Sequence, residues 1–111
     1  LQCRFDYRLA RPPESETLMF TLYRLLLELW NNVCKHADAS EVSNALWKQN
    51  DRLQLAVRDN GVGLASGSQP GFGIQGMRER VSALGGELTL ESRQGTRVIV
   101  NLPTLLQQTP R

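Results

Sequence analysis

The stretch DNGVG at residues 59–63 decides the fold, because it closes the alternating run LQLAVR at residues 53–58. Alternation of apolar and polar side chains predicts a half-buried strand, and this one ends on the carboxylate of Asp59. Asn60 and Gly61 then turn the chain. A carboxylate beside two glycines suits a ligand that offers an N–H donor and comes close to the backbone, as the exocyclic amine of adenine does. A plain hairpin turn at Asn60-Gly61 stays open as the alternative.

The rest of the chain supplies further strands and two helices around this stretch. Stretches with strand patterns are residues 1–9, 40–49, 52–58, 87–91 and 96–102. In the first of them, Cys3, Phe5, Tyr7 and Leu9 alternate, which predicts a strand with one buried face. KQND at residues 48–51 is the expected turn between the second and third strands.

Two stretches have the three- and four-residue spacing of amphipathic helices. The first runs from Pro13, which fits a first helical turn, to about Ala37. The second runs from Gly73 to Leu84 and ends at two glycines. The order of elements predicts an α+β fold, a two-layer α/β sandwich. Its mixed, mostly antiparallel sheet carries helices on one face and is partly wet on the other.

Length and composition exclude several classes of protein. The 111 residues suit one domain, which we expect at residues 1–103, with a loose tail at 104–111. Lysine and arginine number 13 against 11 acidic residues, and their scatter argues against a nucleic-acid partner. Cys3 and Cys34 lack disulfide-framework or zinc spacing, which favours a reducing cytosolic setting. No apolar stretch is long enough to span a bilayer, and a start at Leu1 suggests a piece of a longer protein.

Polar residues gather on one edge of the first predicted helix. At 100° per residue, Glu28, Asn32 and Lys35 lie within about 60° of one another. A carboxylate, a neutral amide oxygen and a point charge are the groups that a magnesium–nucleotide site needs. The alternative is that all three are the solvated edge of a core helix. His36 adjoins them, but a lone histidine more often packs than reacts.

The motif GFGIQG at residues 71–76 fits two kinds of nucleotide site. In a dinucleotide-binding βαβ unit it directly follows a buried strand, and an acidic residue comes about twenty positions later. Glu91 lies at that distance, but LASGSQP at residues 64–70 is not a core strand. The flanks favour the other interpretation, in which the glycines end a mobile loop and open a helix whose free N–H groups meet phosphate oxygens.

Four stretches together carry a resemblance to a known family. ELWNNVCKHA at 28–37, DNGVG at 59–63, GFGIQGMRERV at 71–81 and LGG at 84–86 resemble the N, G1 and G2 boxes of bacterial sensor histidine kinases. The MRERV run and LGG are similar to the subclass that pairs with NarL-type response regulators. The resemblance implies the catalytic ATP-binding domain, with the Bergerat fold that gyrase, Hsp90 and MutL share.

The resemblance also implies roles for particular residues at the triphosphate. Asn32 would ligate Mg²⁺, Glu28 would orient or activate a group near the γ-phosphate, and Lys35 would contact phosphate. The glycines that would wrap the phosphates as a lid closes are Gly71, Gly73 and Gly76.

At the base, the resemblance makes Asp59 the acceptor for the adenine amine, with Gly61 and Gly63 lining the ring. Thr96 resembles the strand threonine that supports the adenine site. The family's Pro-Gly-x-Gly-Thr turn is shortened here to RQGT at residues 93–96, which leaves the role of Thr96 open.

The expected function is to bind ATP and Mg²⁺ and to donate the γ-phosphoryl to a histidine on a separate helical domain. The resemblance implies a homodimeric parent protein in the bacterial inner membrane, with this domain cytoplasmic and a response regulator downstream. A GHKL-type ATPase, an anti-sigma-type serine-protein kinase and a module that binds ATP without chemistry remain as alternatives. A module of that last kind would lack Glu28 or Asn32, and both are present.

Overall fold

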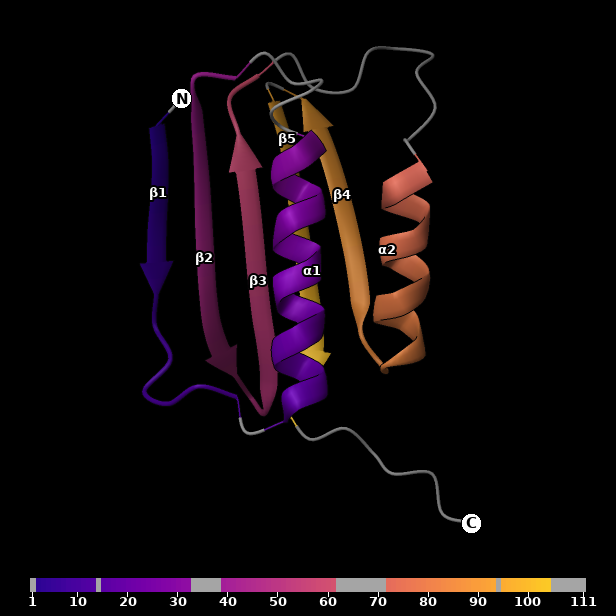
Figure 1. Ribbon diagram of the computed structural model, residues 1–111. Coiled ribbons are helices and arrows are strands. Elements are labelled where there is room, and N and C mark those ends of the chain that lie inside the picture. The colour runs from indigo at the N-terminus through magenta and orange to yellow at the C-terminus, as the bar shows by residue number, and fades with distance from the viewer. Residues whose placement is uncertain (1, 14, 33–38, 62–71, 94, 105–111) are drawn as a thin grey trace.

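The computed structural model describes residues 2–13, 15–32, 39–61, 72–93 and 95–104. Within them, strands and helices follow one another in the predicted order (Figure 1). Their bounds are β1 Gln2–Tyr7, α1 Glu16–Asn32, β2 Glu41–Gln49, β3 Arg52–Asp59, α2 Phe72–Ala83, β4 Glu87–Arg93 and β5 Gly95–Pro103. The predicted strands and the second helix therefore agree with the structure to within a few residues at each end.

The described strands form one five-stranded sheet in the order β1-β2-β3-β5-β4. β1 pairs with β2 in parallel, whereas the other three pairs are antiparallel. Both helices cover the same face of the sheet (Figure 1). The predicted two-layer α/β sandwich with a mixed, mostly antiparallel sheet is confirmed.

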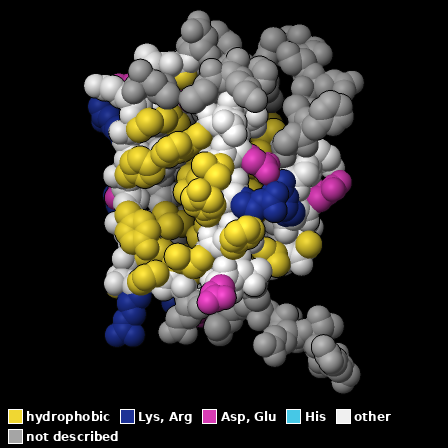
Figure 2. Space-filling model, viewed as in Figure 1, with side chains coloured by type: hydrophobic (Ala, Val, Ile, Leu, Met, Phe, Trp, Pro, Cys, Tyr) yellow, Lys and Arg dark blue, Asp and Glu magenta, His cyan; other side chains and the backbone are white. Residues whose placement is uncertain are grey.

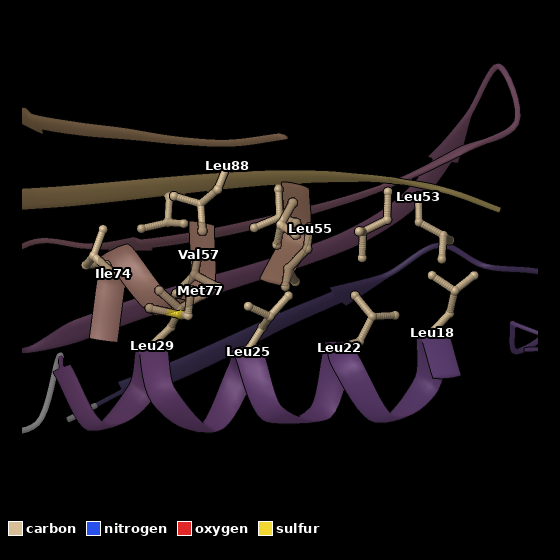
Figure 3. Packing of buried hydrophobic residues seen from close by; sticks show 14 of the residues in the cluster. Leu18, Leu22, Leu25, Leu29, Leu53, Leu55, Val57, Ile74, Met77 and Leu88 are labelled. Atoms are coloured by element: carbon tan, nitrogen blue, oxygen red, sulfur yellow. The ribbon is translucent and has the colours of Figure 1, made fainter. Parts of the chain in front are cut away.

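The core forms between the helices and this face of the sheet. α1 contributes four leucines at steps of three or four residues, so they share one side of the helix. Figure 3 shows them pointing toward the strands, with Ile74 and Met77 of α2 beside them. The buried apolar residues are Leu18, Leu22, Leu25, Leu29, Val42, Leu53, Leu55, Val57, Ile74, Met77, Val81, Leu88, Val98, Val100 and Leu102. Burial of each such side chain stabilises the fold by about 1.5–3 kcal/mol.

The start of α1 differs from the prediction. Pro13 lies before the helix, which begins at Glu16. Ser15 takes the capping position instead, because its Oγ accepts a hydrogen bond from the N–H of Leu18 at 3.2 Å. A serine oxygen satisfies one of the free N–H groups of a first turn, which proline at that point cannot do. The predicted continuation to Ala37, which includes Cys34, lies outside the described residues.

The prediction of a buried face on β1 is wrong. All six of its residues are exposed, Phe5 at 63% and Tyr7 at 58%. β1 is an edge strand that pairs only with β2 among the described strands, and the four leucines of α1 point to the strands beyond it. Trp30 reaches over from α1, and its ring lies 5.3 Å from that of Phe5. Figure 2 shows the hydrophobic side chains that gather over β1 and α1 as a result.

A buried amide ties β1 and α1 to the sheet. Asn44 in β2 accepts a hydrogen bond from the Trp30 indole N–H at 2.8 Å and donates one to the carbonyl of Arg4 at 3.1 Å.

At the other end of the chain, the N–H and hydroxyl of Thr104 both donate to the carbonyl of Asp51. Residues 105–111, the rest of the predicted tail, lie outside the described residues. Neither described helix combines the length and apolar character that crossing a membrane requires.

Candidate nucleotide-binding site

Asp59 is the last residue of β3 and a buried charge, with 5% of its surface exposed. The alternation along β3 places it on the same face as Leu55 and Val57, so its carboxylate faces the helical layer. Its Oδ1 accepts hydrogen bonds from the N–H of Gly61 at 2.9 Å and of Thr96 at 3.3 Å. The structure therefore brings three of the predicted base-binding residues together. Within the described residues, both hydrogen bonds to this carboxylate end on the same oxygen.

Gly95 sets how closely β5 approaches Asp59. Its φ is +104°, a backbone conformation that L side chains rarely adopt. A Cβ at this position would overlap the carbonyl oxygen of Asp59. Only glycine fits here, and the fit places the N–H of Thr96 against the carboxylate. Motif spacing marks Gly95 only as the neighbour of Thr96, whereas the φ that makes it necessary is visible only in the structure.

Asn60 holds the chain that follows Asp59. Its Oδ1 accepts hydrogen bonds from the N–H groups of Ser40 and Glu41, each at 2.9 Å, and its Nδ2 donates to the Ser40 hydroxyl. The alternative of a hairpin turn at Asn60-Gly61 is wrong, because the strands beside β3 are reached by other connections. The β2–β3 hairpin turns instead at Asn50 and Asp51, whose φ values of 51° and 62° suit a tight turn.

Glu28 and Asn32 lie one helical turn apart near the end of α1. Glu28 Oε1 accepts a hydrogen bond from Arg80 Nη2 of α2 at 2.7 Å. Its Oε2 is buried and has no hydrogen-bond partner among the described residues. Asn32 is the last residue of α1 and is half-buried. Sequence reasoning assigned no role to Arg80.

The remaining predicted site residues are only partly described. Gly73 and Gly76 lie within the first turns of α2, which begins at Phe72. The dinucleotide-binding alternative is wrong, since the strands before and after α2 are not neighbours in the sheet: β5 lies between β3 and β4 and pairs antiparallel with both. Glu91, its acidic candidate, is exposed and faces Arg97 across the sheet edge. The residues that lie outside the described part of the chain are Lys35, His36, Gly63 and Gly71.

The candidate site has two parts: the buried carboxylate of Asp59 at the end of β3, and the carboxylate of Glu28 with the amide of Asn32 near the end of α1. Figure 1 places both of these ends, together with the start of β5, at the same end of the sandwich.

Residues 19–106 match the family described as histidine kinase-, DNA gyrase B-, and HSP90-like ATPase. The chain belongs to this family.

Similar proteins of known class show which branch of this family the chain resembles. The histidine-protein kinase/phosphatase UhpB of Salmonella typhimurium is 52% identical over 99 residues, which are 88% of this chain and 20% of UhpB. DegS of Brevibacillus brevis, also a histidine-protein kinase/phosphatase, is 32% identical over 84% of this chain and 25% of DegS. The sensor histidine kinase LiaS of Bacillus subtilis is 35% identical over 74% of this chain and 24% of LiaS. The chain is the catalytic ATPase domain of a sensor histidine kinase, and it spans about a fifth to a quarter of these relatives.

Solved structures support the fold. The histidine kinase domain of the blue-light activated kinase EL346 from Erythrobacter litoralis superposes with a TM-score of 0.77. It is 20% identical and is matched over 92% of this chain and 52% of that one. AdeS of Acinetobacter baumannii, a histidine kinase, also gives 0.77, at 16% identity over 93% of this chain and 54% of that one. The Bergerat fold expected from the sequence is confirmed.

Substitution of Gly95 tests whether its approach to Asp59 is needed for the fold. Gly95→Ala adds a methyl group against a backbone carbonyl at a positive φ, so we expect a loss of more than about 1 kcal/mol in the free energy of unfolding. Gly76→Ala is the control, because a Cβ there would lie 3.7 Å from its nearest neighbour, Arg80 Nη2. Alanine inside a helix should leave that variant as stable as the wild type or up to about 1 kcal/mol more stable. Urea denaturation without nucleotide measures both, and equal changes would contradict the assignment.

Proposed function

We propose that this domain binds ATP through Asp59 and donates the γ-phosphoryl to a histidine on a separate domain of the same kinase. The proposal rests on the hydrogen bonds that fix the carboxylate of Asp59. Two backbone N–H groups, of Gly61 and Thr96, hold Oδ1 of a buried aspartate. Among the described residues nothing donates to Oδ2, so this oxygen could accept a hydrogen bond from a donor such as the exocyclic amine of adenine.

The base would lie against the backbone beyond Asp59. We assign Gly61 and Gly63 to the lining of the adenine ring, because residues without a Cβ allow a planar ligand to approach the chain. Thr96 supports the site in this proposal through its backbone N–H. The shortened turn before it is no obstacle, since the tight fit of Gly95 against Asp59 already brings Thr96 within hydrogen-bond distance.

The triphosphate and Mg²⁺ would lie toward the end of α1. Glu28 offers a buried carboxylate oxygen without a partner among the described residues, and Asn32 offers an amide oxygen one turn later. Oxygen donors of this kind fit Mg²⁺, which is usually held by few protein groups together with phosphate and water. When bound, the ion would neutralise charge on the phosphates. In this proposal Asn32 ligates Mg²⁺, and Glu28 orients or activates the group near the γ-phosphate.

Further contacts to the phosphates are assigned to a lysine and to the motif glycines. Lys35 would contribute a point charge. Gly71, Gly73 and Gly76 would wrap the phosphates at the start of α2, where the free N–H groups of the first turn and the helix dipole favour negative charge. The position of Gly73 in the first turn of α2 supports this part of the proposal.

The parent protein is larger than this chain, since the relatives are four to five times as long as the part they share with it. We propose that it is a homodimeric kinase in the inner membrane, with this domain in the cytoplasm. The phosphoryl acceptor would be a histidine of its helical domain, and a NarL-type response regulator would receive the group in turn. A GHKL-type ATPase clamp and an anti-sigma-type serine kinase are less favoured, because the relatives named here are histidine kinases.

Replacement of Asp59 by asparagine tests the adenine assignment. The asparagine side chain keeps an oxygen that accepts from the two backbone N–H groups, so the fold should survive. Its NH2 group, however, replaces the oxygen that would accept from the adenine amine, and two donors would then face each other. Loss of one charged hydrogen bond costs about 1.5–3 kcal/mol, and we expect ATP affinity to fall about ten- to a hundredfold. Asp51→Asn, the same charge change in an exposed turn, should bind as the wild type does. Calorimetric titration measures all three proteins, and equal affinity in a folded Asp59→Asn variant would refute the assignment.

Replacement of Asn32 by alanine tests the metal assignment. The gain in ATP affinity between EDTA and Mg²⁺ should shrink several-fold, because the hard cation loses an oxygen ligand. Binding of adenosine should not change. Asn31→Ala is the matched control, since Asn31 is the exposed neighbour on the same helical turn. If Asn32→Ala keeps the full magnesium dependence, Asn32 belongs to the solvated edge of α1.

A further inference from the structure

One ion pair joins the two helices beside the core. Arg80 lies in the last turn of α2, and its Nη2 is 2.7 Å from Oε1 of Glu28, 52 residues earlier in the chain. The other ion pairs between described residues lie along the sheet edges or within one turn, and none of them links two helices. This pair therefore fixes a side chain of the proposed site from a second element.

We infer that Arg80 is a positioning residue for Glu28, an inference that rests on the role proposed for Glu28 above. A glutamate side chain has several rotatable bonds and can present either oxygen in many directions. A charge-assisted hydrogen bond to Oε1 removes most of this freedom. Oε2 is then held in one place, buried and without a partner among the described residues.

Stability alone does not account for this arrangement. The side chain of Arg80 is 38% exposed and that of Glu28 is 28% exposed, and ion pairs of such exposure contribute little to folding. A buried acceptor without a partner is itself unfavourable. Glu28 Oε2 is such an acceptor among the described residues. A donor or a cation that arrives with the nucleotide would give this oxygen its missing partner.

The side chain of Arg80 passes Gly76 on its way to Glu28. Gly76 lies one turn before Arg80, and a Cβ on it would be 3.7 Å from Arg80 Nη2. Side chains on a helix lean toward its N-terminus, so the arginine runs back over Gly76. The guanidinium therefore follows the surface of α2 toward the end where the helix begins, and from there it reaches Glu28 on α1.

The sequence of α2 offers a matched control. Arg78 is on the same helix, carries the same charge and is exposed. Arg80→Gln removes the charge that holds Glu28, Arg80→Lys keeps a charge without the planar fork, and Arg78→Gln removes an equal charge from a neighbouring position.

The experiment uses the full-length kinase that contains this chain. Phosphorylation of the protein by labelled ATP and Mg²⁺ is followed over time at saturating ATP, and ATP affinity is titrated separately. A side chain displaced by about 1 Å can cost a hundredfold in rate, so Arg80→Gln should lower the rate constant about ten- to a hundredfold. Its ATP affinity should stay within about twofold of the wild type because Asp59, not Glu28, holds the base. Arg80→Lys should recover part of the rate, and Arg78→Gln should match the wild type in both measurements.

A double-mutant cycle separates positioning from a structural role. If Arg80 acts through Glu28, adding Arg80→Gln to Glu28→Gln should lower the rate no further. Additive losses, or a wild-type rate for Arg80→Gln, would overturn the inference while leaving the proposed function in place. Absence of ATP binding or of phosphorylation in the wild type would refute the proposed function itself. A wild-type rate for Glu28→Gln would overturn both the role of Glu28 and that of Arg80.

Discussion

The arrangement of the proposed site depends on a buried carboxylate that backbone N–H groups compensate. Removal of a carboxylate from water costs free energy unless the charge is hydrogen-bonded. Asp59 meets this condition through two N–H groups that come from different segments, the chain after β3 and the start of β5. The charge therefore fixes how these segments approach each other, and Gly95 allows the approach because it has no side chain.

Packing of the core determines the other half of the site. The four buried leucines of α1 fix the rotation of the helix about its axis, because only one side of it meets the sheet (Figure 3). With the rotation fixed, Glu28 faces α2, where it pairs with Arg80, and Asn32 follows one helical turn later. The spacing of the leucines therefore determines both how α1 packs on the sheet and where its polar residues lie.

Much of the fold follows from sequence pattern, but some features depend on distant contacts. Alternation along residues 53–59 gives β3 and the position of Asp59, since each strand residue points to the opposite face from the last. The same alternation in residues 2–7 says which side chains share a face, but not whether another element covers it. The exposure of Phe5 and Tyr7 was therefore missed. Motif spacing gave Glu28 and Asn32 in the last turns of α1 and Asp59 at the end of β3, and these two element ends lie at the same end of the sandwich (Figure 1). The supporting roles of Gly95, Asn60 and Arg80 were not predicted, because each acts on a residue at least 19 positions away or through a backbone angle. Nothing in the spacing of the second helix distinguishes Arg80 from Arg78, because the contact with Glu28 is visible only in the structure.

The most direct test of the central claim changes the ligand instead of the protein. Purine riboside triphosphate has the ring, ribose and phosphates of ATP but lacks the exocyclic amine. If Asp59 accepts a hydrogen bond from that amine, the wild-type domain should bind this analogue about ten- to a hundredfold more weakly than ATP in calorimetric titration. Equal affinity for the two nucleotides would contradict the claim that Asp59 recognises adenine through its exocyclic amine.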